Sequence, residues 1–247
     1  MAALFISDLH IDASRPAIVE QFLEFLATEA TDADALYILG DLFETWIGDD
    51  AADAAQAAAI AGLHAFTSHG VPCFVMHGNR DFLLAAQFCR MSGALLLPDP
   101  LIVTLYGEPV LVMHGDALCS DDLAYQRLRA TVREPDWQRQ FLALSIASRR
   151  ALAGAARVGS QAHTAAVEYA ITDVNAGTVA TALRRAGTAT LLHGHTHRPA
   201  IHALRVDGRP CTRIVLGDWY DQGSVLRWDH NGPELRSLPR TGMVTEG

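Results

Sequence analysis

The chain contains no lysine, few cysteines and no long apolar run, and each of these absences argues against a class of protein. All 19 of its basic residues are arginine, against 28 acidic residues, which gives a formal net charge of −9. Proteins that bind nucleic acids in general are more often basic, so we expect no nucleic-acid partner. Every cationic contact to a phosphate must come from a guanidinium, which binds oxyanions in a fork.

The four cysteines form neither a CxxC pair nor a dense framework, so they predict reduced, packed thiols and no disulfide scaffold. The N-terminal stretch "MAALFISDLH" lacks a basic region, and its apolar part is too short for a signal peptide. The sequence contains no run of about 18 apolar residues, so it predicts no membrane span. We therefore expect a cytoplasmic protein whose contact with a membrane is at most peripheral.

The order of apolar and polar residues predicts an α/β protein. A chain of 247 residues, half of them hydrophobic, suits one large α/β domain or one such domain with a modest insertion. Short apolar strands are expected to alternate with helices in the first part of the chain, which favours a parallel sheet with crossover helices. The expected strands are 2–7, 35–39 and 73–76, and the expected helices are 15–30, 51–68 and about 81–90.

From about residue 94 the pattern changes. The stretches "LIVTLY" and "PVLVMH" flank a "GE" turn and predict a hairpin, and further strands are expected at 189–193, 200–206, 212–217 and 224–230. Residues 121–186 between them have helical character and almost no strand signal. The chain is therefore expected to divide into a framework, 1–120 and 187–247, and a helical insertion, 121–186.

The first part of the insertion is basic within an acidic chain. Residues 121–160 hold seven arginines against four acidic residues. A helix that mixes basic and apolar residues can lie at an anionic membrane interface. An ordinary core face with solvated arginines explains the same pattern equally well.

Five stretches place polar side chains directly after an expected strand. They are "SDLH" (7–10), "GDLFE" (40–44), "GNRD" (78–81), "MHGD" (113–116) and "HGHTHRP" (193–199). Ligand sites in α/β sheets gather at the carboxyl ends of strands, so the five stretches are expected to meet. The candidate metal ligands are Asp8, His10, Asp41, Asn79, His114, His195 and His197.

These residue types suit a site for two divalent cations. Mixed carboxylate, imidazole and amide ligands favour Mn, Fe, Co or Zn over a Cys-rich structural zinc. Seven ligands are enough for two ions if one carboxylate bridges them, and ions about 3.5–4 Å apart can clamp a phosphoryl group during in-line attack. Each stretch alone also fits a turn, a helix cap or a surface histidine. Five in this order indicate a dinuclear site.

The order D-x-H, G-D, G-N-[HR]-D, H-G-D and G-H-T-H resembles the calcineurin-like metallophosphoesterases, and the resemblance covers the whole framework. It implies a four-layer sandwich of two mixed β-sheets flanked by helices, with the insertion as a helical cap. The stretches "GDLFETWIGDD", "HGNRDFL", "HGDALCSDDLAYQ" and "HGHTHRP" are similar to the branch of this family that hydrolyses UDP-2,3-diacylglucosamine in lipid A synthesis.

The resemblance also implies a reaction. That branch uses two Mn ions and a hydroxide that attacks the α-phosphorus of the pyrophosphate, and it releases UMP and 2,3-diacylglucosamine 1-phosphate. It works on a UDP-linked glycolipid through a lipid-binding cap, so peripheral association with the cytoplasmic face of the inner membrane is expected. We expect the chain to act as a monomer.

The resemblance divides the ligands between the two ions, with Asp41 shared as the bridge. One ion would be held by Asp8, His10, Asp41 and His197, and the other by Asp41, Asn79, His114 and His195. The implied catalytic residues are Asp41, Arg80 and His195.

Arg80 stands where many relatives of the wider family have a histidine that protonates the leaving group. An arginine stays charged, so it cannot be that acid. A phosphate monoester, whose second pKa is roughly 6, needs little protonation to leave, which fits a pyrophosphate substrate. Arg80 can instead hold phosphate oxygens. The alternative is a surface contact between Arg80 and Asp81, and Asp81 is itself predicted to cap the following helix.

The resemblance implies substrate contacts at Asn79, Arg80, Asp122, Ser160, Thr164, Val167 and His195. Relatives often have an amide at Thr164 and a lysine at Val167, and a valine side chain cannot hold a phosphate. Arg157 is a candidate replacement. Tyr125 lies one turn from Asp122 and is predicted to border the nucleotide or stack on it.

Two other functions fit parts of the pattern. A general dinuclear metallophosphoesterase acting on nucleotides or phosphodiesters is disfavoured by Arg80, by the net charge and by the helical insertion. A non-catalytic scaffold with a decayed site is disfavoured by the complete set of seven ligands.

Overall fold

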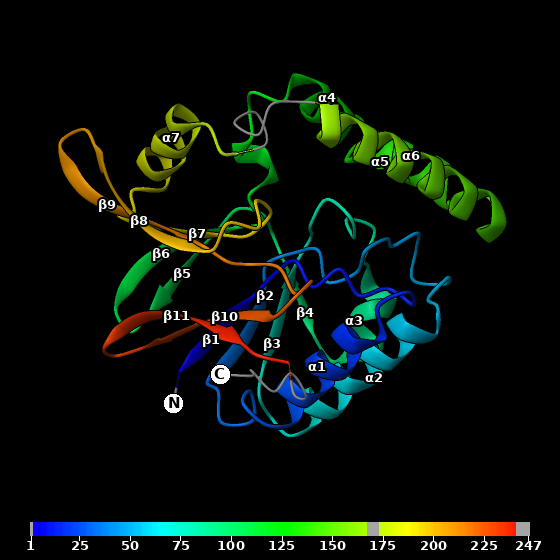
Figure 1. Ribbon diagram of the computed structural model, residues 1–247, viewed down its shortest axis with the longest axis horizontal. Coiled ribbons are helices and arrows are strands. Elements are labelled where there is room, and N and C mark those ends of the chain that lie inside the picture. Colours follow the sequence, from blue (N-terminus) through cyan, green and yellow to red (C-terminus); the bar gives the residue numbers. More distant parts are fainter. Residues whose placement is uncertain (1, 167–172, 241–247) are drawn as a thin grey trace, which may run out of the picture.

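Two mixed β-sheets stacked face to face form the centre of the protein, seen in a computed structural model that describes residues 2–166 and 173–240, without the side chains of 160–166 (Figure 1). The six-stranded sheet has the order β11-β10-β1-β2-β3-β4, and the five-stranded sheet has the order β5-β6-β7-β9-β8. The strands of the first sheet are β1 (Ala3–Ile6), β2 (Ala35–Ile38), β3 (Cys73–Met76), β4 (Leu95–Leu97), β10 (Gly223–Asp229) and β11 (Gly232–Leu238). Those of the second are β5 (Leu101–Leu105), β6 (Glu108–Met113), β7 (Thr190–His193), β8 (Ala200–Val206) and β9 (Arg209–Val215).

Each sheet has a parallel centre and antiparallel strands at its margin. Strands β1 to β4 run parallel, and β10 and β11 add antiparallel at one side. In the second sheet β6, β7 and β9 run parallel, and β5 and β8 pair antiparallel at the two edges. The strands that precede the five polar stretches are therefore all parallel members of their sheets.

Helices cover the outer faces of both sheets. The helices α1 (Pro16–Ala27), α2 (Ala54–Ser68) and α3 (Ala86–Ser92) pack against the six-stranded sheet, and α7 (Ala176–Ala186) packs against the five-stranded one (Figure 1). In β1, Leu4 and Ile6 face the helices while Ala3 and Phe5 face the other sheet. Both faces of this strand are buried, which explains why its sequence is apolar throughout. The predicted four-layer arrangement of helices, sheet, sheet and helix is confirmed.

The remaining helices form an arm outside the four layers. Helices α4 (Leu123–Val132), α5 (Pro135–Leu142) and α6 (Ile146–Ala166) lie beyond the loops that follow β2 and β3 (Figure 1). By contrast α7 packs its Val179 and Leu183 on the five-stranded sheet. The division at residues 121 and 186 stays a prediction. No helix in the described part of the chain is both long and apolar enough to cross a membrane.

The structure differs from the expected elements at three places. The helix expected at about 81–90 begins only at Ala86, where the carboxylate of Asp49 accepts hydrogen bonds from the backbone N–H groups of Gln87 and Phe88. The strands β4 and β11 were not predicted. β4 has only three residues, and β11 is a mostly half-buried edge strand that contains glycine and proline, so neither carries a strong apolar signal.

The layer between the two sheets should contribute strongly to stability. Leu192 is fully buried there, and we expect Leu192→Ala to lower the free energy of unfolding by about 2–5 kcal/mol because it leaves a cavity. The matched control is Ile201→Ala, since Ile201 is half exposed in β8 and its truncation should change stability by less than about 0.5 kcal/mol. Urea denaturation measures both. Equal losses for the two variants would contradict this placement of the core.

Candidate metal centre and substrate cavity

Five of the seven predicted metal ligands have a left-handed backbone. Their φ angles are 55° at Asp8, 51° at His10, 51° at Asp41, 68° at His195 and 56° at His197. This region costs a residue other than glycine about 1–3 kcal/mol, and such strain clusters at functional sites. The other two such residues in the described chain lie in tight turns between paired strands. The fold therefore holds these five side chains in unusual positions.

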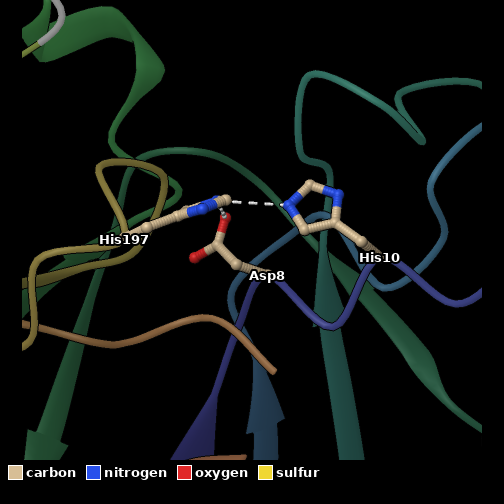
Figure 2. Close-up of side chains that lie close together, drawn as sticks. All are labelled: Asp8, His10 and His197. Carbon is tan, nitrogen blue, oxygen red and sulfur yellow. Dashed lines mark hydrogen bonds and ion pairs between the residues drawn. The ribbon is translucent and has the colours of Figure 1, made fainter. Parts of the chain in front are cut away.

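Asp8, His10 and His197 form the first ligand group (Figure 2). His10 Nε2 lies 3.2 Å from His197 Nε2, which in turn lies 3.5 Å from Asp8 Oδ1. The carboxylate and the two rings come from the loops after β1 and β7 and point toward one another (Figure 2). One candidate ligand atom from each residue lies within 4.8 Å of the others.

Asp41, His114 and His195 form the second group, with the same spacing of candidate ligand atoms. The amide oxygen of Asn79 joins them, because Asn79 Oδ1 lies 3.0 Å from His114 Nε2 and 2.9 Å from His195 Nδ1. All seven predicted ligands are thus brought together from five loops.

The carboxylate of Asp41 faces both groups. Its Oδ2 lies 3.8 Å from His10 Nε2, and its Oδ1 lies 3.8 Å from His114 Nε2. This is the position that a bridging carboxylate requires.

The electrostatics of the buried cluster fit two divalent cations. Burial raises the pKa of Asp41 to about 7 and lowers the pKa of His195 to about 3. Burial also lowers the pKa of His197, but Asp218 and Asp8 outweigh this and raise it to about 10. Asp8 Oδ1 is buried without a hydrogen-bond partner in the described chain. Bound cations would keep these carboxylates ionised and the imidazoles neutral, which is the state that metal ligation needs.

The neighbours of the histidines leave one ring nitrogen facing the cluster. His114 Nδ1 contacts the carbonyl oxygen of Leu39 at 2.9 Å, and His197 Nδ1 lies 3.3 Å from Asp218 Oδ2. Such partners fix the tautomer and the orientation of metal-binding histidines. Asp218 was not predicted, although "LGDWY" repeats the pattern of a strand followed by Gly-Asp, which was the available signal.

Asp81 ties the loops after β2 and β3 together. Its buried carboxylate accepts hydrogen bonds from the backbone N–H groups of Gly78 and Leu42, both at 2.8 Å, and from those of Asp41 and Phe43, both at 3.3 Å. The prediction that Asp81 caps the following helix is therefore wrong. The alternative of a surface contact between Arg80 and Asp81 is also wrong, because Asp81 is fully buried.

Arg80 lies beside the cluster. Its backbone N–H donates to Asp41 Oδ1 at 2.8 Å, while its Nε is buried without a hydrogen-bond partner in the part of the chain that the structure describes. Tyr125 is stacked on His195, with ring centroids 6.0 Å apart, and its Oη donates to Asp116 Oδ2 at 2.6 Å. Both side chains line one cavity, so both predicted contacts lie where a substrate could reach them.

Asp116 attaches α4 to the framework. Besides Tyr125 it accepts a hydrogen bond from Arg129 Nε at 2.7 Å, and Arg133 on the same helix donates to the carbonyl oxygen of Gly78. No pattern in the sequence indicates these partners, because they depend on how the helix is placed.

The other predicted substrate contacts are Asp122, Ser160, Thr164 and Val167. Asp122 caps α4, since its Oδ1 accepts a hydrogen bond from the N–H of Tyr125 at 2.9 Å. Ser160 and Thr164 belong to α6, but their side chains are outside the described part. Val167 lies outside the described residues.

A cavity of about 580 Å³ runs from the cluster under the helical arm. Its polar end is lined by Glu44, Asn79 and Arg80. The rest is lined largely by apolar residues of the framework loops and of α4 to α6: Trp46, Ile47, Phe82, Leu83, Leu128, Val132, Trp137, Phe141, Leu144, Leu152, Ala153 and Ala156. One end can therefore take a charged group and the other an apolar one.

The fold and the paired ligand groups are typical of dinuclear phosphoesterases. The sequence model of the calcineurin-like phosphoesterases matches residues 1–199, and the chain belongs to that family. A relative from Xanthomonas axonopodis pv. citri (strain 306), named UDP-2,3-diacylglucosamine hydrolase, is 53% identical over 245 residues, which cover 96% of this chain and 99% of the relative. A relative of the same name from Stenotrophomonas maltophilia (strain R551-3) is 53% identical over 97% of this chain and 100% of its own length. The predicted family is confirmed.

Gly78 provides a test of the geometry. A Cβ at this position would overlap with Oδ1 and the backbone nitrogen of Asp41, so we expect Gly78→Ala to displace that carboxylate. Metal affinity should fall by about 10- to 100-fold, as it does when groups around metal ligands are disturbed. The control is Gly154→Ala, because Gly154 has open space around it. Calorimetric titration with Mn²⁺ would measure both, and unchanged affinity in Gly78→Ala would contradict the role of Asp41.

Proposed function

We propose that this protein hydrolyses the pyrophosphate bond of UDP-2,3-diacylglucosamine at the α-phosphorus, giving UMP and 2,3-diacylglucosamine 1-phosphate for lipid A synthesis. The observation that carries the proposal is the cavity that joins the ligand cluster to an apolar chamber. A substrate with a pyrophosphate at one end of its sugar and acyl chains on the other matches this change of lining. The names of the relatives support the same substrate.

The proposed metal cofactors are two Mn ions. Asp8, His10, Asp41 and His197 would hold one ion, and Asp41, Asn79, His114 and His195 the other. When bound, the ions would polarise phosphoryl oxygens and lower the pKa of the attacking water. The mixture of carboxylate, imidazole and amide donors supports a first-row divalent ion of this kind.

The residues beside the cluster would position the substrate. The guanidinium of Arg80 would hold oxygens of the pyrophosphate and stabilise the charge that develops as the bond breaks. It supplies no proton, and the leaving phosphate needs little protonation. Asn79 and His195 would contact the same phosphate groups, and Tyr125, stacked on His195, would border the nucleotide.

The helices α4 to α6 would form the lipid-binding cap. Together with the residues up to 186 they make up the proposed insertion, in which Asp122, Ser160, Thr164 and Val167 are the proposed substrate contacts. Seven of the eleven exposed large hydrophobic side chains in the described chain lie between Leu123 and Val158. This concentration supports peripheral association with the cytoplasmic face of the inner membrane. A monomer suffices, because all seven ligands come from one chain.

The substrate assignment predicts a selective activity. We expect the Mn²⁺-loaded protein to release UMP from UDP-2,3-diacylglucosamine while leaving p-nitrophenyl phosphate diesters and DNA uncleaved. Parallel assays with Mg²⁺, Co²⁺ and Zn²⁺ at equal occupancy test the metal. Strong diesterase activity without UMP release would overturn the proposal in favour of a general dinuclear metallophosphoesterase.

Arg80 provides a second test. We expect Arg80→Ala to lower kcat by about 10²- to 10³-fold, as the loss of a group that stabilises transition-state charge does, with bound Mn²⁺ unchanged. The control is Arg90→Ala, because Arg90 is exposed on α3 away from the cavity, and its kcat should match the unaltered protein. If Arg80→Ala kept full turnover, the proposed role of the guanidinium would be wrong.

A further inference from the structure

Glu44 is a buried carboxylate between a predicted metal ligand and the helical arm. Its Oε2 lies 3.4 Å from His10 Nδ1 and 3.8 Å from Arg15 Nη1, and its Oε1 contacts Nη1 of Arg157 on α6. Only 3% of Glu44 is exposed. Burying a carboxylate is costly unless charged or hydrogen-bonding partners surround it, so these three contacts account for its burial.

His10 and Arg157 contact different oxygens of the Glu44 carboxylate. His10 Nδ1 and Glu44 Oε2 face each other, and in the described chain neither atom has another hydrogen-bond partner. His10 Nε2 points into the ligand cluster. If Nε2 binds a metal, Nδ1 must carry the proton, and that proton then points at Oε2. A carboxylate fixed at Oε2 keeps Oε1 directed at Arg157.

A second ion pair joins the same helix to the framework without touching a ligand. Arg149 Nη1 and Nη2 contact Asp50 Oδ1 and Oδ2 at 2.8 and 2.5 Å, and Nη1 also donates to the carbonyl oxygen of Ile47. This pair also attaches α6 to the framework, but it has no contact with the metal cluster. The chain thus supplies its own control for the attachment of α6.

We infer that Glu44 is a positioning residue that couples metal binding at His10 to the closure of α6 over the cavity. The inference rests on the metal centre of the proposed function. Because Glu44 and Arg157 both line the cavity next to the ligand cluster, their pairing closes the polar end of the chamber when the metal is bound. Coupling of this kind is reciprocal, so α6 held closed must also favour metal binding.

Hydrogen exchange of the α6 amides at 146–159, with and without Mn²⁺, tests the coupling. Addition of Mn²⁺ should slow exchange in the unaltered protein. In Glu44→Gln the slowing should be lost, and the Kd for Mn²⁺ should rise by about tenfold, at the lower end of the effect of such partners. Arg157→Ala should lose the slowing and Arg157→Lys should retain it, because the lysine keeps a cation near Oε1.

The control is Asp50→Asn, which weakens the other attachment of α6. It should speed exchange of α6 without metal but keep both the Mn²⁺-dependent slowing and the Kd of the unaltered protein. Circular dichroism confirms that each variant is folded. Equal behaviour of Glu44→Gln and Asp50→Asn would overturn this inference alone, since Mn²⁺ would still bind. An unaltered protein that binds no Mn²⁺ would overturn both this inference and the proposed function.

Discussion

The buried carboxylate of Asp41 between two groups of imidazoles is the interaction on which the rest of the site depends. An anion at this depth is costly unless positive charge surrounds it, and its pKa of about 7 expresses that cost. Cations in the two adjacent ligand groups would remove it. The parallel centres of both sheets serve this arrangement, because they direct the loops that carry the ligands to one place.

The loops that carry the candidate ligands have strained backbone conformations. Asp8, His10, Asp41, His195 and His197 all have backbone conformations that side chains normally avoid. Asp81 holds the loop of Asp41 in place by accepting hydrogen bonds from the loops after β2 and β3 at once. Asp81 was predicted to cap a helix, but its carboxylate is occupied by these loop hydrogen bonds. The glycine at position 78 follows from the same crowding, since Asp41 occupies the space of its side chain.

The helical arm adds what the framework alone lacks, which is an apolar chamber adjoining a charged cluster. Apolar packing and polar contacts both attach the arm: Phe141, Trp137 and Ala153 pack on the main core of the framework. The polar contacts join Tyr125 and Arg129 to Asp116, Arg149 to Asp50, and Arg157 to Glu44. The two candidate ligand groups therefore adjoin a cavity that has one polar end and an otherwise largely apolar lining.

The sequence by itself determined the α/β class, the hairpin and the seven candidate ligands, because the period of apolar residues and the polar residues after each strand are local features, while the four layers were implied by the family resemblance. The family followed from the order of the same stretches. Tertiary structure alone decided the partners of Asp81, Asp116 and Glu44, the late start of α3 and the packing of α7 on the second sheet. A carboxylate can cap a helix, join two loops or pair with an arginine, and only the groups that folding brings near it decide among these. The cavity likewise depends on where α4 to α6 lie, and the spacing of apolar residues along the chain does not specify that position.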